Sequence, residues 1–505
     1  MGRYHLGFDA GTQSVKVVVY DDGGNCVAES SHPTTIRYPG PKMVEMDVDE
    51  YVEVTVRGMR DCTDSMRSRG LDPGEIDSIF GDGIICGITG IDEDGNSITP
   101  FINYLDSRTQ EDADYINSLH LGIWAEETGN AEALCMFPAM FARWFLANGY
   151  RGKVRKFVHN CPYINMHLAG LKAEDAFIDQ GAFSGWGLGY DIRKKEWSEE
   201  QLEILGIDRE LLPRVVKPWD VIGTLTEEMS ERTGVPEGTP ICAGAGDTMQ
   251  SMIGCGATEP GMAVDVAGTC AMFCVSTDGI IPELSSPGTE LIFNSGSMDD
   301  TYFYWGYIRT GGLALRWFRD NVSHEDFPDM SAKAAEVPPG CNGLVFLPYL
   351  TGGVGDMTDA SGCFLNMGLD TDRYAMWRAV LEAICYDYMT VTDMYRAAGI
   401  DLSRITVAEG GSADDLWNQM KADSMGSDVA VMKTRGGALV TDCVMGSHAA
   451  GGVPDLDSGI RGLATVDRSF VPDGDNTRFY RRTYGLRENA LKEGMKGVFG
   501  TLRSL

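Results

Sequence analysis

Residues 6–20 read Leu-Gly-Phe-Asp-Ala-Gly-Thr-Gln-Ser-Val-Lys-Val-Val-Val-Tyr. Apolar and β-branched residues flank Gly11, so this stretch predicts a strand, a tight turn and a second strand. The pattern returns at residues 262–275, which read Met-Ala-Val-Asp-Val-Ala-Gly-Thr-Cys-Ala-Met-Phe-Cys-Val. Each stretch places Ala-Gly-Thr at its turn, so the chain is expected to contain two similar hairpins.

The repeated turn has two interpretations. An ordinary hairpin needs glycine only for its backbone conformation, and this requires no ligand. Recurrence in two halves of similar length favours a second interpretation, in which two turns with backbone N–H groups and a Thr hydroxyl clamp an oligophosphate. Asp9 would then hold Mg²⁺ or its waters, and Lys16 would add a cation near the first turn.

The composition restricts the partners. The chain has 505 residues, which suggests two or three domains, and its 42 Lys and Arg against 74 Asp and Glu give a formal net charge of -32. Nucleic acids and anionic membranes attract clustered positive charge, so neither is an expected partner. The 13 cysteines are scattered, and no leader or long apolar run is recognised. We therefore expect a soluble cytoplasmic protein.

Helical and strand patterns are mixed in both halves, which predicts an α/β protein. In the first half we expect a helix at residues 48–68 and buried strands at residues 76–80 and 84–88. In the second half, apolar residues at steps of three and four from Trp377 to Tyr395 predict one long helix.

A domain boundary is expected at the polar turn Glu259-Pro260-Gly261, directly before the second hairpin. This choice divides the chain into domains of residues 1–258 and 259–505.

Two further stretches could carry chemistry. Residues 243–250 read Ala-Gly-Ala-Gly-Asp-Thr-Met-Gln, and Asp247 there is either a helix N-cap or the general base of a phosphoryl transfer. In the second stretch, Gly410 and Gly411 would let a flat ligand such as adenine lie against backbone. Ser412 with Asp415 resembles a capping box, which predicts a helix start at the same place.

Other catalytic motifs are missing. The sequence has no P-loop, no protein-kinase signature and no histidine spacing typical of a metal site. Gly81, Gly83 and Gly87 come near the dinucleotide fingerprint, which keeps a nicotinamide-dependent oxidoreductase as one alternative. A second alternative is an actin-like ATPase without sugar kinase activity.

Taken in order, these stretches resemble the FGGY family of carbohydrate kinases within the actin-like ATPase superfamily. The resemblance covers nearly the whole chain and includes residues 104–109, Tyr-Leu-Asp-Ser-Arg-Thr, and residues 311–318, Gly-Gly-Leu-Ala-Leu-Arg-Trp-Phe. It implies two ribonuclease-H-like α/β domains with a cleft between them. It also implies ATP and Mg²⁺ as cofactors and a small-molecule sugar or polyol as substrate.

The resemblance also implies site residues. Asp9 would position Mg²⁺, and Asp247 matches the catalytic base. The expected nucleotide-binding residues are Gly11, Thr12, Gln13, Ser14, Lys16, Gly268, Thr269, Gly312, Gly410, Gly411 and Asp415. The expected substrate-binding residues are Ile85, Cys86, Tyr104, Asp106, Arg108 and Asp247.

One departure from the family pattern concerns the substrate. Residues 82–87 read Asp-Gly-Ile-Ile-Cys-Gly where xylulose kinases carry Ser-Gly-Gln-Met-His-Gly, so the Gln and His that would meet sugar hydroxyls are absent. We expect transfer of the ATP γ-phosphate to a ketopentose similar to xylulose or ribulose, or to a related sugar or polyol. Self-association as a homodimer is compatible with the sequence.

Overall fold

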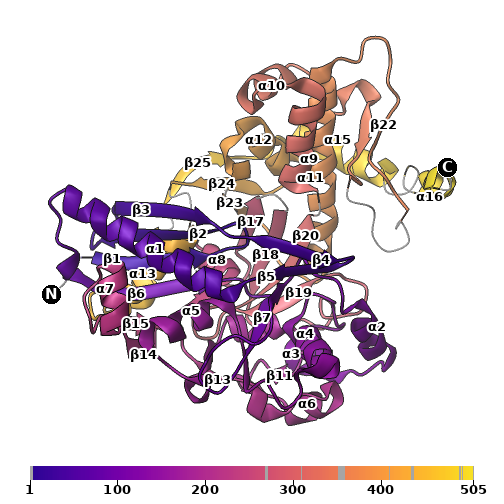
Figure 1. Cartoon of the computed structure of the whole chain (residues 1–505). Helices are drawn as coiled ribbons and strands as arrows, with labels where there is room; N and C mark the ends of the chain where they lie inside the picture. Colours follow the sequence, from indigo (N-terminus) through magenta and orange to yellow (C-terminus); the bar gives the residue numbers. More distant parts are fainter. Residues whose placement is uncertain are drawn as a thin grey trace. The chain divides into compact units, whose positions relative to one another are not determined.

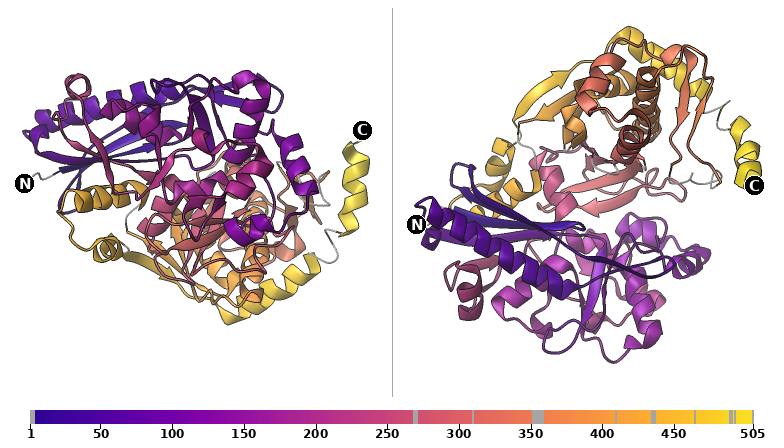
Figure 2. Two further views of the ribbon diagram at one scale, coloured as in Figure 1. Left: turned by 90° about the horizontal axis from the view of Figure 1, so that it is seen from below. Right: turned by 45° about the horizontal axis from the view of Figure 1, so that its top comes forward.

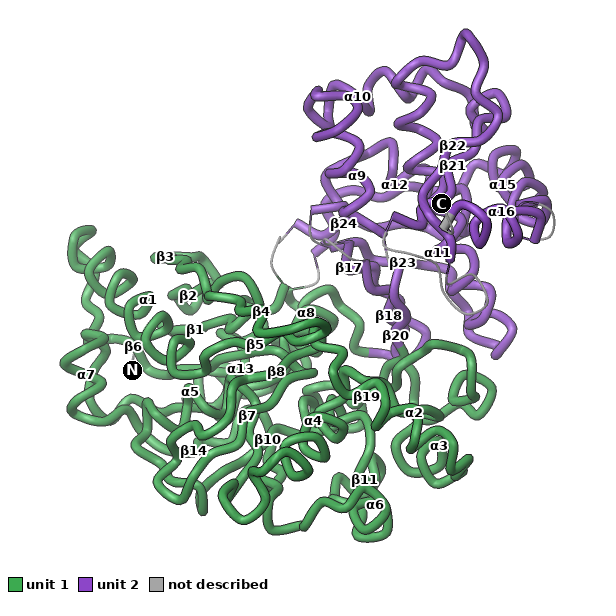
Figure 3. The backbone as a smooth tube through the Cα atoms, turned by 45° about the vertical axis from the view of Figure 1, so that its right-hand side comes forward, with its two compact units in different colours: residues 1–258, 277–304, 436–464 green, residues 259–276, 305–435, 465–505 purple. Residues whose placement is uncertain are grey.

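The chain forms two compact units, seen in green and purple in Figure 3. The structure is a computed structural model that describes residues 4–267, 271–308, 310–350, 359–408, 410–433, 437–463, 465–487, 491 and 493–503. Unit 1 comprises residues 1–258, 277–304 and 436–464, and unit 2 comprises residues 259–276, 305–435 and 465–505. The chain passes from unit 1 to unit 2 after Thr258, and two later segments return to unit 1, so the units are interleaved along the chain.

Unit 1 is built around a mixed sheet. Its main strands follow the order β14-β15-β6-β1-β2-β3, and β16 also pairs with β6. Strand β1 is antiparallel to β2 and parallel to β6. The bounds are β1 (Tyr4–Ala10), β2 (Ser14–Asp21), β3 (Cys26–Pro33), β6 (Ile76–Gly83), β14 (Val221–Thr224), β15 (Pro240–Cys242) and β16 (Ala245–Gly246).

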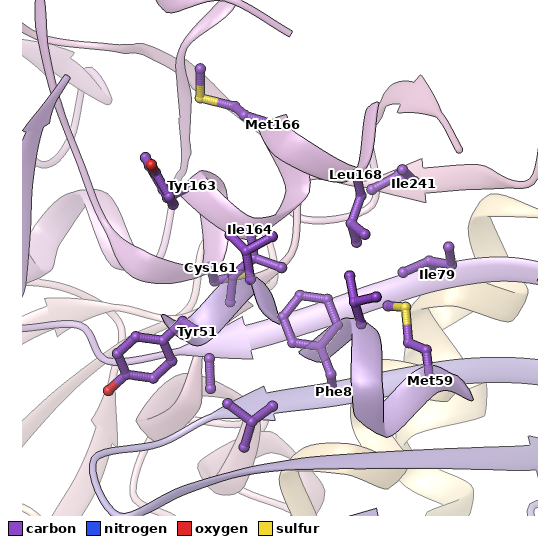
Figure 4. Packing of buried hydrophobic residues seen from close by; sticks show 14 of the residues in the cluster. Phe8, Tyr51, Met59, Ile79, Cys161, Tyr163, Ile164, Met166, Leu168 and Ile241 are labelled. Carbon is purple, nitrogen blue, oxygen red and sulfur yellow. The ribbon is translucent and has the colours of Figure 1, made fainter. Parts of the chain in front are cut away.

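Helices cover both faces of this sheet. Helix α1 (Val48–Ser68), which the sequence predicted with these bounds, lies across one face with α5 (Asn160–Ala169) (Figures 1 and 2). The close view in Figure 4 shows Phe8 of β1 among Met59, Ile79 and Ile164 in this apolar layer. Helices α8 (Asp247–Gly254) and α13 (Gly437–Ala449) pack together, and α13 covers β1 and β6. This packing explains why the segment that carries α13 belongs to unit 1.

A second sheet in unit 1 has the order β4-β5-β8-β7-β9. Its strands are β4 (Ile36–Gly40), β5 (Met43–Met46), β7 (Gly87–Ile91), β8 (Phe101–Asn103) and β9 (Lys156–Val158). The remaining elements of unit 1 are α2 (Gln110–Ser118), α3 (Ile123–Thr128), α4 (Pro138–Phe145), β10 (Phe177–Asp179), β11 (Tyr190–Asp191), β12 (Glu196–Trp197), α6 (Glu199–Leu205), β13 (Arg214–Val216), α7 (Glu227–Thr233), β19 (Ile292–Ser295) and α14 (Leu456–Leu463).

The prediction of a strand at residues 84–88 is wrong. Strand β6 continues to Gly83, residues 84–86 form a bend, and β7 begins at Gly87. Ile84, Ile85 and Cys86 are all buried, so the stretch is as apolar as a buried strand would be. An apolar run indicates burial but does not distinguish a strand from a buried bend.

Unit 2 repeats the strand order of unit 1. Its strands run β20-β18-β17-β23-β24-β25, with β17 antiparallel to β18 and parallel to β23. The bounds are β17 (Ala263–Ala267), β18 (Ala271–Thr277), β20 (Tyr302–Ile308), β23 (Arg404–Ala408), β24 (Asp428–Met432) and β25 (Val466–Phe470). In both units the first strand of the repeated hairpin is therefore central, between its partner in the hairpin and a parallel strand.

The helices of unit 2 include the long helix that the apolar periodicity predicted. It is α11 (Arg373–Ala397), begun by Asp372, whose side chain accepts hydrogen bonds from the N–H groups of Tyr374 and Ala375. The other elements are α9 (Gly311–Phe318), α10 (Phe327–Ala334), β21 (Val345–Leu347), β22 (Cys363–Leu365), α12 (Asp415–Met425), α15 (Gly474–Leu486) and α16 (Glu493–Arg503). No helix in the described ranges is both long and apolar enough to cross a bilayer.

Candidate functional site

The turn of the first hairpin is anchored by its carbonyl oxygens. The carbonyl of Gly11 accepts a hydrogen bond from the Tyr51 hydroxyl at 3.0 Å, and that of Ala10 accepts one from Asn160 Nδ2 at 2.7 Å. Thr34 donates its Oγ1–H to the carbonyl of Thr12 at 2.7 Å and its N–H to that of Gln13 at 3.1 Å. The negative ends of these peptide groups are therefore occupied within unit 1, which leaves the turn suited to an anion.

Around the turn lie Ser14, Lys16 and Tyr104. Lys16 is exposed and pairs in register with Asp9 across the hairpin. The hydroxyl of Tyr104 lies 3.0 Å from Thr12 Oγ1. The structure thus places Tyr104, predicted for the sugar, beside a residue predicted for the phosphates.

Carboxyl groups gather where the central strands of unit 1 end. Asp9 of β1 pairs in register with Asp82 of β6, and Ala245 of β16, two residues before Asp247, pairs with Asp82 as well. Burial raises the pKa of Asp82 well above its ordinary value, and the charges of Asp442, Asp9 and Asp247 raise it further. The sequence predicted roles for Asp9 and Asp247 but none for Asp82 or Asp442, which come together only because α13 packs on β6.

Asp247 is the first residue of α8 and not its N-cap, which is Gly246. The N-cap interpretation of Asp247 is therefore wrong. Its carboxylate accepts hydrogen bonds from the Thr248 N–H at 2.5 Å and the Thr248 hydroxyl at 3.1 Å. Burial, together with the charge of Asp9, raises the pKa of Asp247 to about 7, while the two hydrogen bonds oppose this shift. A carboxyl with such a pKa can accept a proton near neutral pH.

Asp106 and Arg108 bind each other. The Arg108 guanidinium lies 2.8 Å from Asp106 Oδ2 and 2.8 Å from Glu45 Oε1, and it lies over the ring of Trp144. Asp106 also accepts a hydrogen bond from the N–H of Val44 at 2.6 Å and is 1 % exposed. In this structure the pair therefore braces β5 and the loop after β8.

Ile85 and Cys86 lie in the buried bend after β6. The Cys86 thiol donates to the carbonyl of Gly185 at 3.8 Å, and the carbonyl of Ile85 lies 3.0 Å from His159 Nε2. A Cβ atom added at Gly246 would overlap the side chain of Ile85, so the bend packs directly against the residue before Asp247. The wall beside Asp247 is apolar as a result.

The glycines that resemble a dinucleotide fingerprint are explained by packing. A Cβ atom at Gly81 would overlap the ring of Phe8, and one at Gly83 would lie 2.6 Å from Asn160 Oδ1. A Cβ atom at Gly87 would lie 2.5 Å from the ring of Phe101. These glycines allow close approach within unit 1, and the spacing carries no argument for an oxidoreductase.

Unit 2 contains a cavity of about 920 Å³. Gly312, Gly410, Gly411 and Asp415, the residues predicted for the adenosine, all line it. Its wall also includes Leu315, Phe327, Trp377 and Trp417, which the sequence did not indicate. The rings of Phe327 and Trp377 stack with their centroids 5.6 Å apart. A largely apolar cavity with glycine backbone on one side fits a flat aromatic ligand.

The helix at this cavity starts differently from the prediction. Asp414 is the N-cap of α12 and accepts a hydrogen bond from the N–H of Trp417 at 3.1 Å. The prediction of a capping box formed by Ser412 and Asp415 is therefore wrong, because the N-cap is Asp414, two residues after Ser412. Asp415, the first helical residue, forms an ion pair with Arg468.

Gly268 and Thr269, predicted for the second turn, lie outside the described residues. The strands beside them are described, and Asp265 of β17 is fully buried there. Asp265 forms an ion pair with Lys421 of α12 at 2.6 Å and accepts a hydrogen bond from the Tyr388 hydroxyl at 2.6 Å. Lys421 Nζ also lies 3.9 Å from the ring centre of Trp417, so this network supports the floor of the cavity.

The residues present fit a magnesium ion held together with phosphates. Within the part of the chain that the structure describes, no group of three His, Cys, Asp or Glu side chains is placed to bind a metal. Mg²⁺ bound with a nucleotide needs only one or two carboxylates, because phosphates and waters complete its octahedron. Asp9 would supply one carboxylate, and the charge that it exerts on Asp82 and Asp247 is one that a cation would balance.

Comparisons with known proteins agree with this architecture. The xylulose kinase of Bacillus subtilis is 23 % identical over 492 residues, which cover 96 % of each chain. The gluconokinase of the same species is 24 % identical over 497 residues, with 95 % of this chain and 94 % of the relative covered. The crystal structure of the gluconate kinase from Lactobacillus acidophilus superposes with a TM-score of 0.87 at 22 % identity, covering 99 % of this chain and 100 % of that one.

A structure of the Plasmodium falciparum glycerol kinase with ADP has the same TM-score of 0.87, at 20 % identity, covering 96 % of this chain and 97 % of that one. The family models for the N-terminal and C-terminal domains of the FGGY carbohydrate kinases match residues 4–254 and 263–450. These matches confirm the resemblance found in the sequence, and the chain belongs to the FGGY family of carbohydrate kinases.

Proposed function

We propose that the protein transfers the γ-phosphate of ATP to a hydroxyl group of a ketopentose, or of a related sugar, sugar acid or polyol. The position of Asp247 carries the proposal. It starts helix α8 beside the hairpin turn, and its pKa of about 7 suits a general base at neutral pH. Unit 2 supports the same activity, since Gly312, Gly410 and Gly411 line a cavity with the size and apolar character that a nucleoside requires.

In the proposed reaction the acceptor hydroxyl attacks the γ-phosphorus in line with the leaving ADP. The new bond joins the acceptor oxygen to phosphorus, the bond from phosphorus to the β,γ-bridging oxygen breaks, and the hydroxyl proton passes to Asp247. The N–H groups of Thr12 and Gln13 and the hydroxyls of Thr12 and Ser14 would contact phosphate oxygens. Mg²⁺, when bound through Asp9, would neutralise charge on the phosphates.

Lys16 would add its charge from the open side of the hairpin, where it faces Asp9. Asp106 and Arg108 would keep Tyr104 in place beside Thr12 by bracing the loop that carries it. Asp106 and Arg108 are therefore positioning residues, and Tyr104 would lie at the rim of the acceptor site.

The acceptor is expected to differ from xylulose in how it is recognised. Ile84 and Cys86 stand where xylulose kinases carry Gln and His, and the buried Ile85 between them packs against Gly246, so the wall there is apolar. A pocket that lacks polar partners binds a hydroxyl-rich ligand less well, so this wall favours an acceptor with fewer hydroxyl groups on that side.

An ADP-release assay with a panel of acceptors tests the proposal. Xylulose, ribulose, gluconate and glycerol would be compared at equal concentration against ATP with no acceptor. We expect one class of acceptor to raise ADP release well above the acceptor-free rate and to appear as a phosphorylated product by mass spectrometry. Equal ADP release with every acceptor, and no phosphorylated product, would favour the alternative of an ATPase without sugar kinase activity.

A further inference from the structure

A group of buried oxygen atoms behind the strand ends of unit 1 lacks hydrogen-bond donors. Asp82, Asp442 and Gln250 are each fully buried. With both carboxyl groups ionised, the two oxygens of Asp82, Oδ2 of Asp442 and Oε1 of Gln250 find no hydrogen-bond donor among the described residues. All four atoms are acceptors, so water-free burial without a donor or a cation would be strongly unfavourable.

The fold places these three side chains together. Gln250 lies one turn after Asp247 on α8, and its Nε2 donates to Asp442 Oδ1 of α13 at 2.7 Å. One turn further along α13, a Cβ atom at Gly446 would lie 2.7 Å from Ser78 Oγ and 3.5 Å from Phe80 Cβ of β6. Alternate residues of a strand share a face, so Asp82 faces α13 as Ser78 and Phe80 do. The carboxyl groups of Asp82 and Asp442 also lie within hydrogen-bonding reach of each other, so a proton on one of them can be shared with the other.

The orientation of Gln250 is informative. Its amide nitrogen donates to Asp442 Oδ1, and its amide oxygen finds no hydrogen-bond donor in the described part of the chain. This oxygen belongs to a neutral side chain and is therefore independent of the carboxyl pair. An amide oxygen and carboxylate oxygens are the ligands that hard cations such as Ca²⁺ and Mg²⁺ prefer.

We propose that Asp82, Asp442 and Gln250 form a binding site for a divalent cation, separate from the Mg²⁺ expected at Asp9. One shared proton would satisfy a single oxygen of each carboxyl and would leave the second oxygen of Asp82 and the amide oxygen of Gln250 without a donor. A cation contacts all four oxygens at once, and a charge of two neutralises both carboxylates. Waters or backbone carbonyls would complete its coordination.

The role of such an ion would be to join three elements. Asp82 belongs to β6, Asp442 to α13 and Gln250 to the helix that begins with Asp247. The ion would hold α8 and α13 on the sheet and so fix the start of α8. The proposal concerns binding and stability and does not depend on the activity proposed above.

Binding of Mn²⁺ to the full-length protein, treated with chelator and free of nucleotide, tests the proposal. Equilibrium dialysis of the wild type should show one bound Mn²⁺ that Ca²⁺ displaces. Asp82→Asn and Asp442→Asn keep the side-chain size and remove a charged ligand, so each should weaken this binding by more than about tenfold. Asp179→Asn is the matched control, because Asp179 is a buried carboxylate of β10 that accepts hydrogen bonds from the N–H groups of Gly181 and Ala182, and this variant should retain the ion.

Thermal unfolding gives a second measurement. Mn²⁺ or Ca²⁺ should raise the Tm of the wild type in a concentration-dependent manner, since an ion that binds only the folded state stabilises it. Asp82→Asn relieves an uncompensated buried charge, so this variant should fold without metal and should lose the Tm response. Absence of bound Mn²⁺ in the wild type, or equal binding in Asp82→Asn, would overturn the proposal. If lowering the pH stabilises the protein while neither cation does, the two carboxyl groups share a proton and bind no ion, and the proposal is overturned.

Discussion

The strands of the two hairpins pair in the same antiparallel way but carry opposite distributions of charge. Counted back from Ala-Gly-Thr, Phe8 and Asp9 of unit 1 correspond to Asp265 and Val266 of unit 2. In unit 1, Phe8 is buried in an apolar core, and Asp9, one residue nearer the turn, is a carboxylate. In unit 2, Asp265 is the carboxylate and is buried against Lys421 and Tyr388, and Val266, one residue nearer the turn, is apolar.

The two carboxylates, Asp9 and Asp265, are therefore expected to have different roles. A carboxylate beside the turn, with Asp82 and Asp247 on the neighbouring strands, supplies charge where a metal and a proton would be handled. A carboxylate in the interior, paired with Lys421 beside the ring of Trp417, supports a cavity wall. We expect substitutions in unit 1 to change chemistry and equivalent substitutions in unit 2 to change stability or nucleotide affinity.

The largest expected effect is that of Asp247→Asn. The variant keeps the size of the side chain and removes the base, so kcat should fall about a thousandfold, within the usual range for a general base. The binding of ATP, followed by fluorescence or calorimetry without acceptor, should stay nearly unchanged because the nucleoside cavity belongs to unit 2. Turnover close to that of the wild type would remove Asp247 from the proposed mechanism.

Asp265→Ala should act mainly on stability. The substitution leaves Lys421 buried without its partner, and breaking a buried ion pair in this way typically costs about 3–5 kcal/mol of unfolding free energy. Urea unfolding measures the loss, and Asp265→Ala combined with Lys421→Met should recover part of it because no lone charge remains.

The matched substitution in unit 1 is Asp9→Asn. It should leave the unfolding free energy unchanged or slightly raised, since it reduces repulsion with Asp82 and Asp247, while kcat falls by a smaller factor than in Asp247→Asn because phosphates and waters supply most Mg²⁺ ligands. A stability loss for Asp9→Asn as large as that for Asp265→Ala would contradict the division of roles between the hairpins.

Gly411→Ala should have a smaller effect, confined to unit 2. Its new Cβ would overlap Ala267 Cβ and lie 3.0 Å from the ring of Trp417, and overpacking of this kind usually costs about 1–3 kcal/mol. We expect a lower Tm and a higher KM for ATP with little change in kcat. Gly410→Ala is the control for stability, because a Cβ there meets no atom within 4 Å. Equal losses of stability in both variants would show that the cavity wall is not closely packed at Gly411.

The smallest effect is a gradual one with pH. Asp247 must be ionised to accept a proton, and its pKa is raised to about 7, so kcat/KM should fall as the pH drops below about 7, approaching tenfold per unit. This ratio reports the free enzyme, which is the state the pKa describes. A profile that stays level from pH 8 to pH 6 would show that another group accepts the proton or that proton transfer is not limiting.

Local patterns predicted much of the fold. Helices α1 and α11 were predicted from periodicity, and both hairpins from the alternation around Ala-Gly-Thr. The bend at residues 84–86 is apolar throughout, which is why the sequence predicts a strand there. The sequence also predicts the start of α12 at Ser412, because Ser412 can cap a helix as well as Asp414, which is the actual N-cap. In both cases two local structures suit the same residues, and packing selects one of them.

The sequence by itself determined the chemical groups of this protein and their order: a carboxylate before one glycine turn, a carboxylate at the start of a helix, and paired glycines ahead of another helix. Turns, strands and helix starts depend on residues within a few positions of one another, so local sequence is sufficient for them. Only the tertiary structure decided that α13 returns to unit 1 and brings Asp442 to Asp82 and Gln250. Such contacts join residues hundreds of positions apart through the packing of whole elements, which no local pattern specifies.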